Sequence, residues 1–127
     1  MNIIIRNASE LSIYEQIRQQ IRAAILSGEL AAGEQLPSIR QLAKALRISV
    51  ITTKRAYDEL EQEGFIEQVQ GKGSFVKAQN PQLIREEHLR QIEELLAEAW
   101  RLARQADIGP KELRELLDVM GGEPDNG

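Results

Sequence analysis

The chain contains no cysteine, few aromatic residues and no long hydrophobic run. The absence of cysteine excludes disulfides and thiolate metal sites, and it fits a reducing compartment. Because aromatic residues make up only 4% of a chain that is 42% hydrophobic, leucine, isoleucine, valine and alanine must build the core. The apolar runs are too short to cross a membrane, and the N-terminus lacks the basic segment and apolar stretch of a signal peptide. We therefore expect a cytoplasmic protein of one small domain, or of a small domain with an appendage.

Acidic residues outnumber basic ones, but the excess is confined to one part of the chain. The net charge is −4, which taken alone argues against a nucleic-acid partner. Residues 1–79 hold ten lysines and arginines against nine acidic residues, whereas residues 80–127 hold six against eleven. A local basic patch is the relevant sign of nucleic-acid binding. The basic residues that gather in the first part are Arg40, Lys44, Arg47, Lys54, Arg55 and Lys72.

Residues 37–76 have the pattern of a helix, a tight turn, a longer helix and a two-stranded hairpin. Ser38 and Gln41 have the spacing of a capping box, which predicts that the first helix begins there. Ser49 is placed to cap the second helix after a break at residues 47–48, and Gly64 suits the end of that helix. The residues that recur at helical spacing, and so predict the buried face of the second helix, are Thr53, Ala56, Tyr57 and Leu60.

The chain after this helix predicts two strands, at residues 65–69 and 74–77, joined by the glycine-rich tip Gln70-Gly71-Lys72-Gly73. Glycine at the tip permits positive φ angles and a close approach of the backbone to a partner. The tip lacks the spacing of a phosphate-binding P-loop and no helix follows it, so we exclude a nucleotide site there. Helix, turn, helix and hairpin in this order predict a mainly α fold with a small β-hairpin wing. This is a winged helix-turn-helix, whose second helix would enter the DNA major groove.

The N-terminal residues predict a further helix. Residues 2–5 are β-prone, and we expect them either to pair at the edge of the hairpin or to pack on a neighbouring element. Ser12 and Glu15 have the spacing of a second capping box. The helix that follows carries a stripe of isoleucines that must be buried, namely Ile13, Ile17, Ile21 and Ile25.

Asn80-Pro81 marks a boundary, because asparagine can cap a helix and proline suits its first position. We expect a winged helix-turn-helix domain in residues 1–79 and a short helical region in residues 80–127. The latter would contain one helix to about residue 106, another at residues 111–120, and a frayed tail. Both helices are amphipathic and cannot bury their apolar faces alone, so we expect a homodimer in which they pack against the same helices of a second chain. The residues expected at that interface are Leu89, Ile92, Leu96, Trp100, Leu113 and Leu117.

Several short motifs between about residues 12 and 76 occur in a characteristic order. The chain reads Leu-Pro-Ser-Ile-Arg-Gln-Leu-Ala at residues 36–43 and Ile-Ser-Val-Ile-Thr at residues 48–52, followed by ELEQEGFI and GKGSFV. These motifs resemble the DNA-binding domain of the GntR family of bacterial transcription regulators, whose signature runs Leu-Pro-Ser-x-Arg-x-Leu-Ala and then Val-Ser-x-x-Thr. The stretch SVITTKRAY resembles the YtrA-like branch of that family, which also carries a short two-helix C-terminal region.

The resemblance implies a repressor that binds double-stranded operator DNA as a homodimer. It assigns Arg40 to a phosphate or base contact, with a solvated surface arginine as the alternative. Many family members carry an arginine just after the position of Ser49, where it reads guanine; this chain has Val50 and Ile51 there, so contact with thymine methyls is the physical substitute. Arg55 is also open to interpretation as plain surface charge. The residues expected to bind DNA are Arg40, Ser49, Val50, Thr52, Lys54, Arg55, Gly71 and Lys72.

Other classes of function have less support in the sequence. No nucleophile–base pair, metal cluster or cofactor loop is visible, so we expect neither an enzyme nor a cofactor. His88 stands alone among glutamates, which is a poor set of metal ligands. The C-terminal region is small for a ligand-binding domain, and the sequence leaves open an unidentified small-molecule effector. The alternative function is a winged-helix scaffold for protein partners, which would have no need of the basic cluster.

Overall fold

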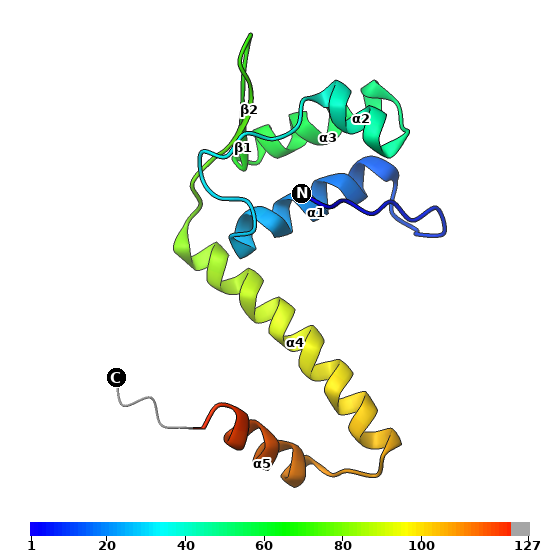
Figure 1. The fold of residues 1–127 in the computed structure, drawn as a ribbon, viewed down its shortest axis with the longest axis vertical. Coiled ribbons are helices and arrows are strands. Elements are labelled where there is room, and N and C mark those ends of the chain that lie inside the picture. Colours follow the sequence, from blue (N-terminus) through cyan, green and yellow to red (C-terminus); the bar gives the residue numbers. More distant parts are fainter. Residues whose placement is uncertain (123–127) are drawn as a thin grey trace. The chain divides into compact units, whose positions relative to one another are not determined.

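The computed structural model describes residues 1–122 and has a mainly helical fold with a small β-hairpin (Figure 1). The chain divides into two compact units, one at Met1–His88, called the head below, and one that begins at Leu89. Residues 123–127, where we expected a frayed tail, lie outside the described residues. The elements in chain order are α1 (Ile13–Ser27), α2 (Ile39–Leu46), α3 (Val50–Gln62), β1 (Ile66–Val69), β2 (Gly73–Val76), α4 (Pro81–Gln105) and α5 (Pro110–Met120).

The core of the head lies mainly between α1 and α3. Ile17 and Ile21 of the expected isoleucine stripe are fully buried, Ile25 is nearly so, and Ile13 packs at the edge of the core. Burial of a side chain of this size contributes about 1.5–3 kcal/mol, so the contact with α1 holds α3 in place. The buried face of α3 is the predicted one, formed by Thr53, Ala56, Tyr57 and Leu60.

α2 and α3 form the expected helix-turn-helix, and the predicted capping box is confirmed. The Ser38 hydroxyl accepts a hydrogen bond from the Gln41 backbone N–H at 3.0 Å, and the Gln41 side chain accepts one from the Ser38 N–H at 2.9 Å. Arg47 ends α2 with a φ of 57°, which turns the chain before α3 begins. The buried Tyr57 hydroxyl donates to the Pro37 carbonyl at 2.7 Å and so ties α3 to the chain that enters α2; burial raises the pKa of this phenol.

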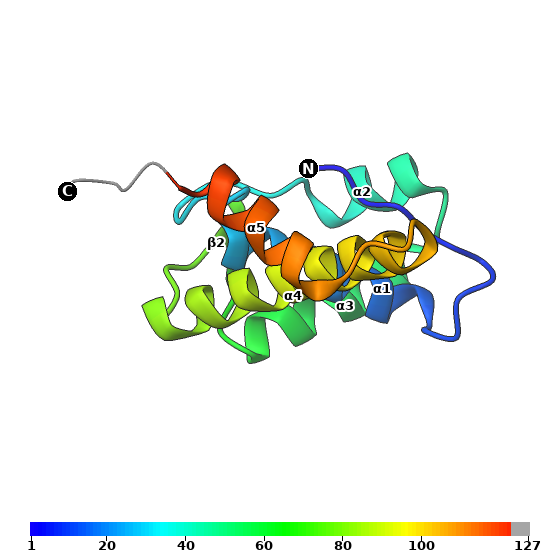
Figure 2. The same cartoon turned by 90° about the horizontal axis from the view of Figure 1, so that it is seen from below.

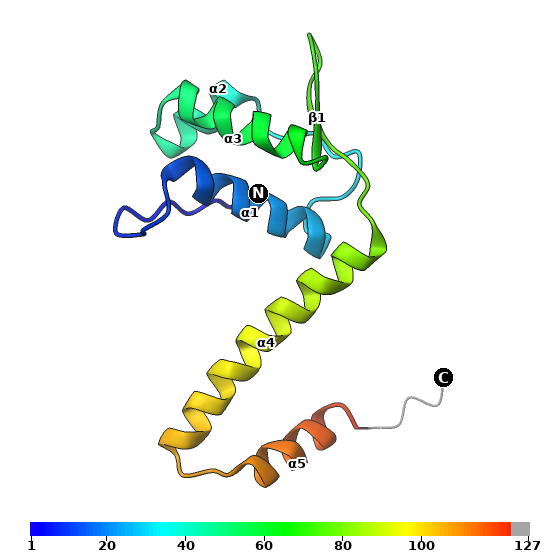
Figure 3. The same cartoon turned by 180° about the vertical axis from the view of Figure 1, so that it is seen from behind.

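The hairpin forms as predicted: β1 is one residue shorter than expected, and β2 has the expected length but begins one residue earlier. The hairpin also has a third partner. β1 and β2 pair in antiparallel fashion along their full length. The segment that precedes α2 pairs with the other edge of β2: the Leu36 N–H donates to the Ser74 carbonyl at 2.8 Å, and the Val76 N–H donates to the Glu34 carbonyl at 2.9 Å. β2 is thereby held along its outer edge from Ser74 to Val76, and the tip of the hairpin projects beyond α3 (Figures 1 and 3).

Of the two alternatives for residues 2–5, the structure shows packing and not pairing. These residues form no strand. Gln20 on α1 binds them instead: its side-chain amide donates to the Ile4 carbonyl at 2.7 Å and accepts from the Ile4 N–H at 2.9 Å. Ile3 and Ile5 pack against the core. The Gln20 side chain therefore satisfies the backbone N–H and carbonyl of Ile4, which would otherwise be available for pairing with a strand.

The expected capping box at the start of α1 is wrong. Ser12 lies at the N-cap position, but its side chain makes no capping hydrogen bond. Glu15 pairs with Arg18 at 2.8 Å instead of reaching back to the cap. Because an arginine three residues along offers a charged partner on the same face of the helix, the carboxylate turns toward it.

α4 begins at the predicted boundary, yet the head extends into it as far as His88. Ile84 packs against the core of the head. The Glu87 carboxylate lies 3.8 Å from the Arg22 guanidinium, and a ring nitrogen of His88 lies 3.3 Å from the Ser27 carbonyl. The first residues of α4 thus belong with the winged head, although the sequence places the boundary before them.

The second unit contains the remainder of α4 and α5. α5 runs back from the end of α4 after the turn at residues 106–109 (Figures 1 and 2). Asp107 has a φ of 60° at this turn, and the Ile108 N–H donates to the Ala103 carbonyl at 2.8 Å, which closes the end of α4. Among residues 1–122, no helix combines the length and apolar character needed to cross a membrane.

Candidate nucleic-acid interface

The N-terminal end of α3 is exposed and carries the residues that the sequence singles out. The Ser49 hydroxyl accepts a hydrogen bond from the Thr52 N–H at 3.0 Å and donates to the Thr52 hydroxyl at 2.8 Å. Ser49 is therefore the cap of α3, as predicted, and the Thr52 hydroxyl keeps its own proton free to donate. Val50 is 47% exposed and Ile51 is 81% exposed. Their backbone N–H groups lie in the first turn, where a helix supplies no carbonyl partners and favours an anion.

A second exposed group of basic side chains lies on α2. Arg40 occupies the second position of this helix, and Lys44 and Arg47 follow at its C-terminal end. All three are exposed, and within residues 1–122 none of them forms an ion pair. Since a positive charge without an acidic neighbour is available to a phosphate, this group has the electrostatic character that DNA binding requires.

Lys54 takes part in a series of polar contacts that links α3 to the hairpin. Its ammonium lies 2.7 Å from one carboxylate oxygen of Asp58, and the Gln68 amide of β1 donates to the other at 2.9 Å. The hydrogen bonds from Gln68 and then from Lys54 lower the pKa of Asp58. The carboxylate therefore stays ionised and offsets part of the positive charge of Lys54. Exposed ion pairs of this kind are weak, so a phosphate can compete for the lysine.

The side chain of Arg55 packs on α1, although it is partly exposed to solvent. Its guanidinium is 3.7 Å from the centre of the Tyr14 ring and donates to the Tyr14 hydroxyl at 3.0 Å, and it lies 3.7 Å from Glu59. A DNA contact by Arg55 would compete with this stacking. Because Tyr14 lies 41 residues before Arg55 in the chain, no local sequence pattern predicts this contact.

Both wing-tip residues are exposed at the end of the hairpin. Gly71 has a φ of 79° and Gly73 a φ of 122°, and the Lys72 N–H donates to the Val69 carbonyl at 2.9 Å across the turn. Gln35, which the sequence did not single out, donates from its side-chain amide to the Lys72 carbonyl at 3.1 Å. The wing therefore presents one lysine on a turn that another part of the head supports.

A known family covers the elements described so far. Residues 13–76 match the family described as bacterial regulatory proteins, gntR family. This range contains α1, α2, α3 and the whole hairpin. The chain belongs to the GntR family.

Relatives extend the similarity to nearly the whole chain. The protein is 34% identical to the HTH-type transcriptional repressor YtrA of Bacillus subtilis (strain 168), over 91% of this chain and 92% of the relative. Among solved structures, YtrA from Sulfolobus acidocaldarius, a GntR-family transcription factor, is 40% identical with a TM-score of 0.58, covering 75% of this chain and 97% of that one. The AraR DNA-binding domain in complex with operator ORE1 is 25% identical with a TM-score of 0.51, covering 60% of this chain and 93% of that one. This GntR-family protein is a DNA-binding transcriptional regulator and not an enzyme.

The second unit of this GntR-family protein has an exposed apolar groove of about 540 Å³ between α4 and α5. Trp100 is 39% exposed and Leu96 is 51% exposed, and both line it. Leu113 and Leu117 line it from α5, so four of the six residues expected at a dimer interface come together. Leu89 and Ile92 are exposed on α4 outside the groove. The apolar residues that line the groove are Leu95, Leu96, Ala99, Trp100, Pro110, Leu113, Leu116, Leu117 and Met120.

Metal binding has no site in the part of the chain that the structure describes. Over residues 1–122, no three histidine, cysteine, aspartate or glutamate side chains are grouped so that they could hold an ion. His88 is close to the Ser27 carbonyl, which is consistent with a structural contact at the start of α4.

The pairing of Lys54 with Asp58 predicts that Asp58→Asn strengthens DNA binding. The change removes a negative charge beside a lysine at the reading helix, so phosphates no longer compete with the carboxylate. We expect the dissociation constant for duplex DNA at low salt to fall about two- to fivefold, with a steeper salt dependence. Fluorescence anisotropy titrations at several salt concentrations measure both quantities. Asp118→Asn makes the same charge change on α5 and is the control, and an equal gain there would show that only net charge matters.

Proposed function

We propose that the protein is a bacterial, cytoplasmic repressor that binds a pseudo-palindromic operator as a homodimer. The observation that carries the proposal is the exposed start of α3 beside the unpaired basic residues of α2. Two heads in one dimer would read two half-sites, and the dimer would fix their spacing. Linking two modest half-site affinities in this way raises the overall affinity without any new contact. Binding of an unidentified small-molecule effector by this protein stays a prediction.

In this proposal α3 enters the major groove with its N-terminal turn toward the bases. Val50 and Ile51 bring apolar surface where many relatives have an arginine, and thymine methyl groups are the base feature that such surface contacts. Ser49 and Thr52 lie beside free N–H groups and suit a phosphate. Arg40 on α2 neutralises a neighbouring phosphate. The wing brings Lys72 to the minor groove or to the phosphates that border it. Lys54 joins a phosphate when the ion pair with Asp58 opens.

The homodimer would form through the apolar faces of α4 and α5. Eleven large apolar side chains of these helices are more than a third exposed, an amount of exposed hydrophobic surface that marks an interaction site. A second copy of the same unit offers the same apolar face, so two copies can cover each other with a two-fold interface. The groove lined by Leu96 and Trp100 would lie at the centre of that interface, where buried aromatic residues contribute most.

The scaffold alternative is less well supported. A surface that binds acidic or apolar protein partners does not need a row of basic residues at the start of a helix-turn-helix. Arg40, Lys44 and Arg47 have no acidic partner among the described residues, so the head carries charge that only an anionic partner would neutralise.

Arg40→Ala tests the DNA-binding role of α2. Loss of a charge-assisted phosphate or base contact should weaken operator binding by about 1–2 kcal/mol, or roughly five- to thirtyfold, with the fold retained. Fluorescence anisotropy measures the affinity, and circular dichroism with thermal melting checks the fold. Arg101→Ala removes the same charge from the exposed surface of α4 and is the control. Unchanged affinity in Arg40→Ala would remove this residue from the interface.

Leu96→Glu tests the proposed homodimer. The substitution places a charge in the apolar groove, which should shift the protein toward monomer because a buried unpaired carboxylate is costly. Light scattering over a concentration series should show a dimer dissociation constant raised at least about tenfold. Ala97→Glu is a matched control, because Ala97 lies on the same helix, is exposed and does not line the groove. A dimer that persists in Leu96→Glu would move the interface elsewhere.

A further inference from the structure

The tip of the wing is held by a side chain from outside the hairpin. The Gln35 amide donates to the Lys72 carbonyl at 3.1 Å. Gly73 comes next in the chain, and a Cβ built there would lie 2.6 Å from the Gln35 amide nitrogen. Gly73 also has a φ of 122°, a backbone conformation that residues with a side chain rarely adopt. The turn therefore has room for the amide only because glycine follows Lys72.

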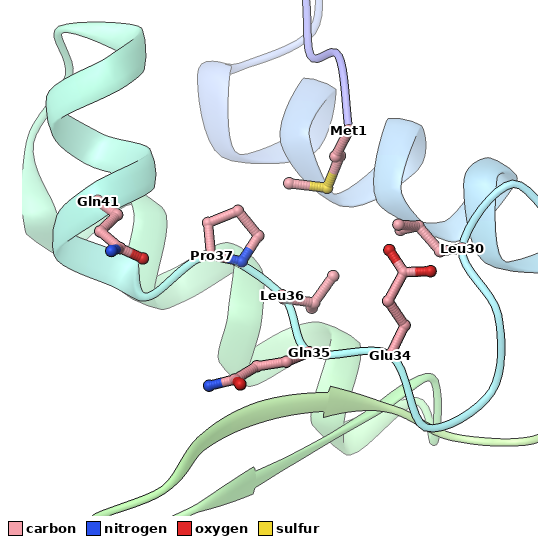
Figure 4. Close-up of a pocket in the computed structure, with 7 residues that line it drawn as sticks. All are labelled: Met1, Leu30, Glu34, Gln35, Leu36, Pro37 and Gln41. Carbon is pink, nitrogen blue, oxygen red and sulfur yellow. The ribbon is translucent and has the colours of Figure 1, made fainter.

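The backbone around Gln35 brings its side chain to this position. Gln35 forms an antiparallel bridge with Phe75 of β2, and the flanking Leu36 N–H and Glu34 carbonyl are hydrogen-bonded to that strand. Its own side chain is left free to extend along the hairpin, and Figure 4 shows it lying beside the strands, away from the side chains of Leu30 and Gln41. These neighbours share with Gln35 the lining of an open hollow of about 520 Å³, so no close packing restrains the amide on that side.

The hydrogen bond from Gln35 to Lys72 connects two of the proposed DNA-binding parts of the head, the wing tip and the start of α2. Gln35 lies three residues before the Ser38 cap of α2, and Arg40 is the second residue of that helix. The wing tip is thus hydrogen-bonded to the same segment that sets the start of α2. The backbone hydrogen bonds from residues 34–36 end at Ser74, so without the Gln35 amide the turn itself would be free to move, and a mobile turn has to be ordered when DNA binds.

We propose that Gln35 is a positioning residue that holds the Lys72 turn in place for DNA binding. The inference rests on the proposed operator binding, because Lys72 is the group that Gln35 positions. Gln35 acts on affinity through the wing and not through a DNA contact of its own. Its removal raises the ordering cost of the wing, so it lowers affinity and reduces the contribution of Lys72 to the salt dependence.

The first test examines the tip in the free protein, with no DNA present. Gln35→Met keeps the length of the side chain and removes the donor. Backbone ¹⁵N relaxation at Gly71, Lys72 and Gly73 should show a clear fall in the heteronuclear NOE, while the residues of α3 keep theirs. Gln19→Met, a change at an exposed glutamine on α1, is the control and should leave the tip unchanged. An unchanged tip in Gln35→Met would overturn the proposal, whatever the protein binds.

The second test is a double-mutant cycle on operator affinity with Gln35→Met and Lys72→Ala. Gln35→Met alone should weaken binding about three- to tenfold, the loss expected for one hydrogen bond. In the Lys72→Ala background the same change should cost less than about twofold, because the group it positions is gone. Full additivity would overturn the proposal and make Gln35 a DNA contact in its own right. If wild-type protein bound no operator, the proposed function would fail, while the relaxation experiment would still decide whether Gln35 holds the tip.

Discussion

The packing of α1 against α3 is the constraint on which the rest of the head depends. Thr53, Ala56 and Tyr57 on one face of α3 are buried and hold the helix in place. Val50 and Ile51 can therefore lie exposed at its N-terminal end without loss of the fold. A helix of this length is marginal in isolation, so the contact with the isoleucine stripe of α1 supplies most of its stability. The burial of one face thus determines which side chains face outward.

Polar contacts then orient the parts that the core leaves free. Tyr57 ties α3 to the chain before α2, Gln68 ties β1 to Asp58 of α3, and Gln35 ties the tip of the hairpin. Each bond is worth only about 1 kcal/mol. Together they join α2, α3 and the wing into one surface, which lowers the ordering cost when a rigid partner such as duplex DNA binds. Net charge has little part in this, because the acidic excess belongs to the chain after residue 79.

The features that could be predicted from sequence are those with local causes. The cap at Ser49 and the capping box at Ser38 depend on groups three residues apart, and the positive φ at Gly64 needs only a glycine. The stacking of Arg55 on Tyr14 and the hydrogen bond from Gln35 to Lys72 join residues 41 and 37 positions apart. No spacing rule predicts such pairs, since they exist only after the helices have packed. The same holds for residues 81–88, which belong to the head because of Ile84 and its neighbours.

The measurement that tests the account most directly is a fluorescence anisotropy titration of the wild-type protein. A labelled duplex from its own upstream promoter and a scrambled duplex of the same composition would each be titrated at two salt concentrations. The account predicts tight binding to the promoter duplex, weaker binding to the scrambled one, and a loss of affinity as salt rises. Absence of binding to either duplex even at low salt would contradict it, because the exposed basic surface of the head would then have no nucleic-acid partner.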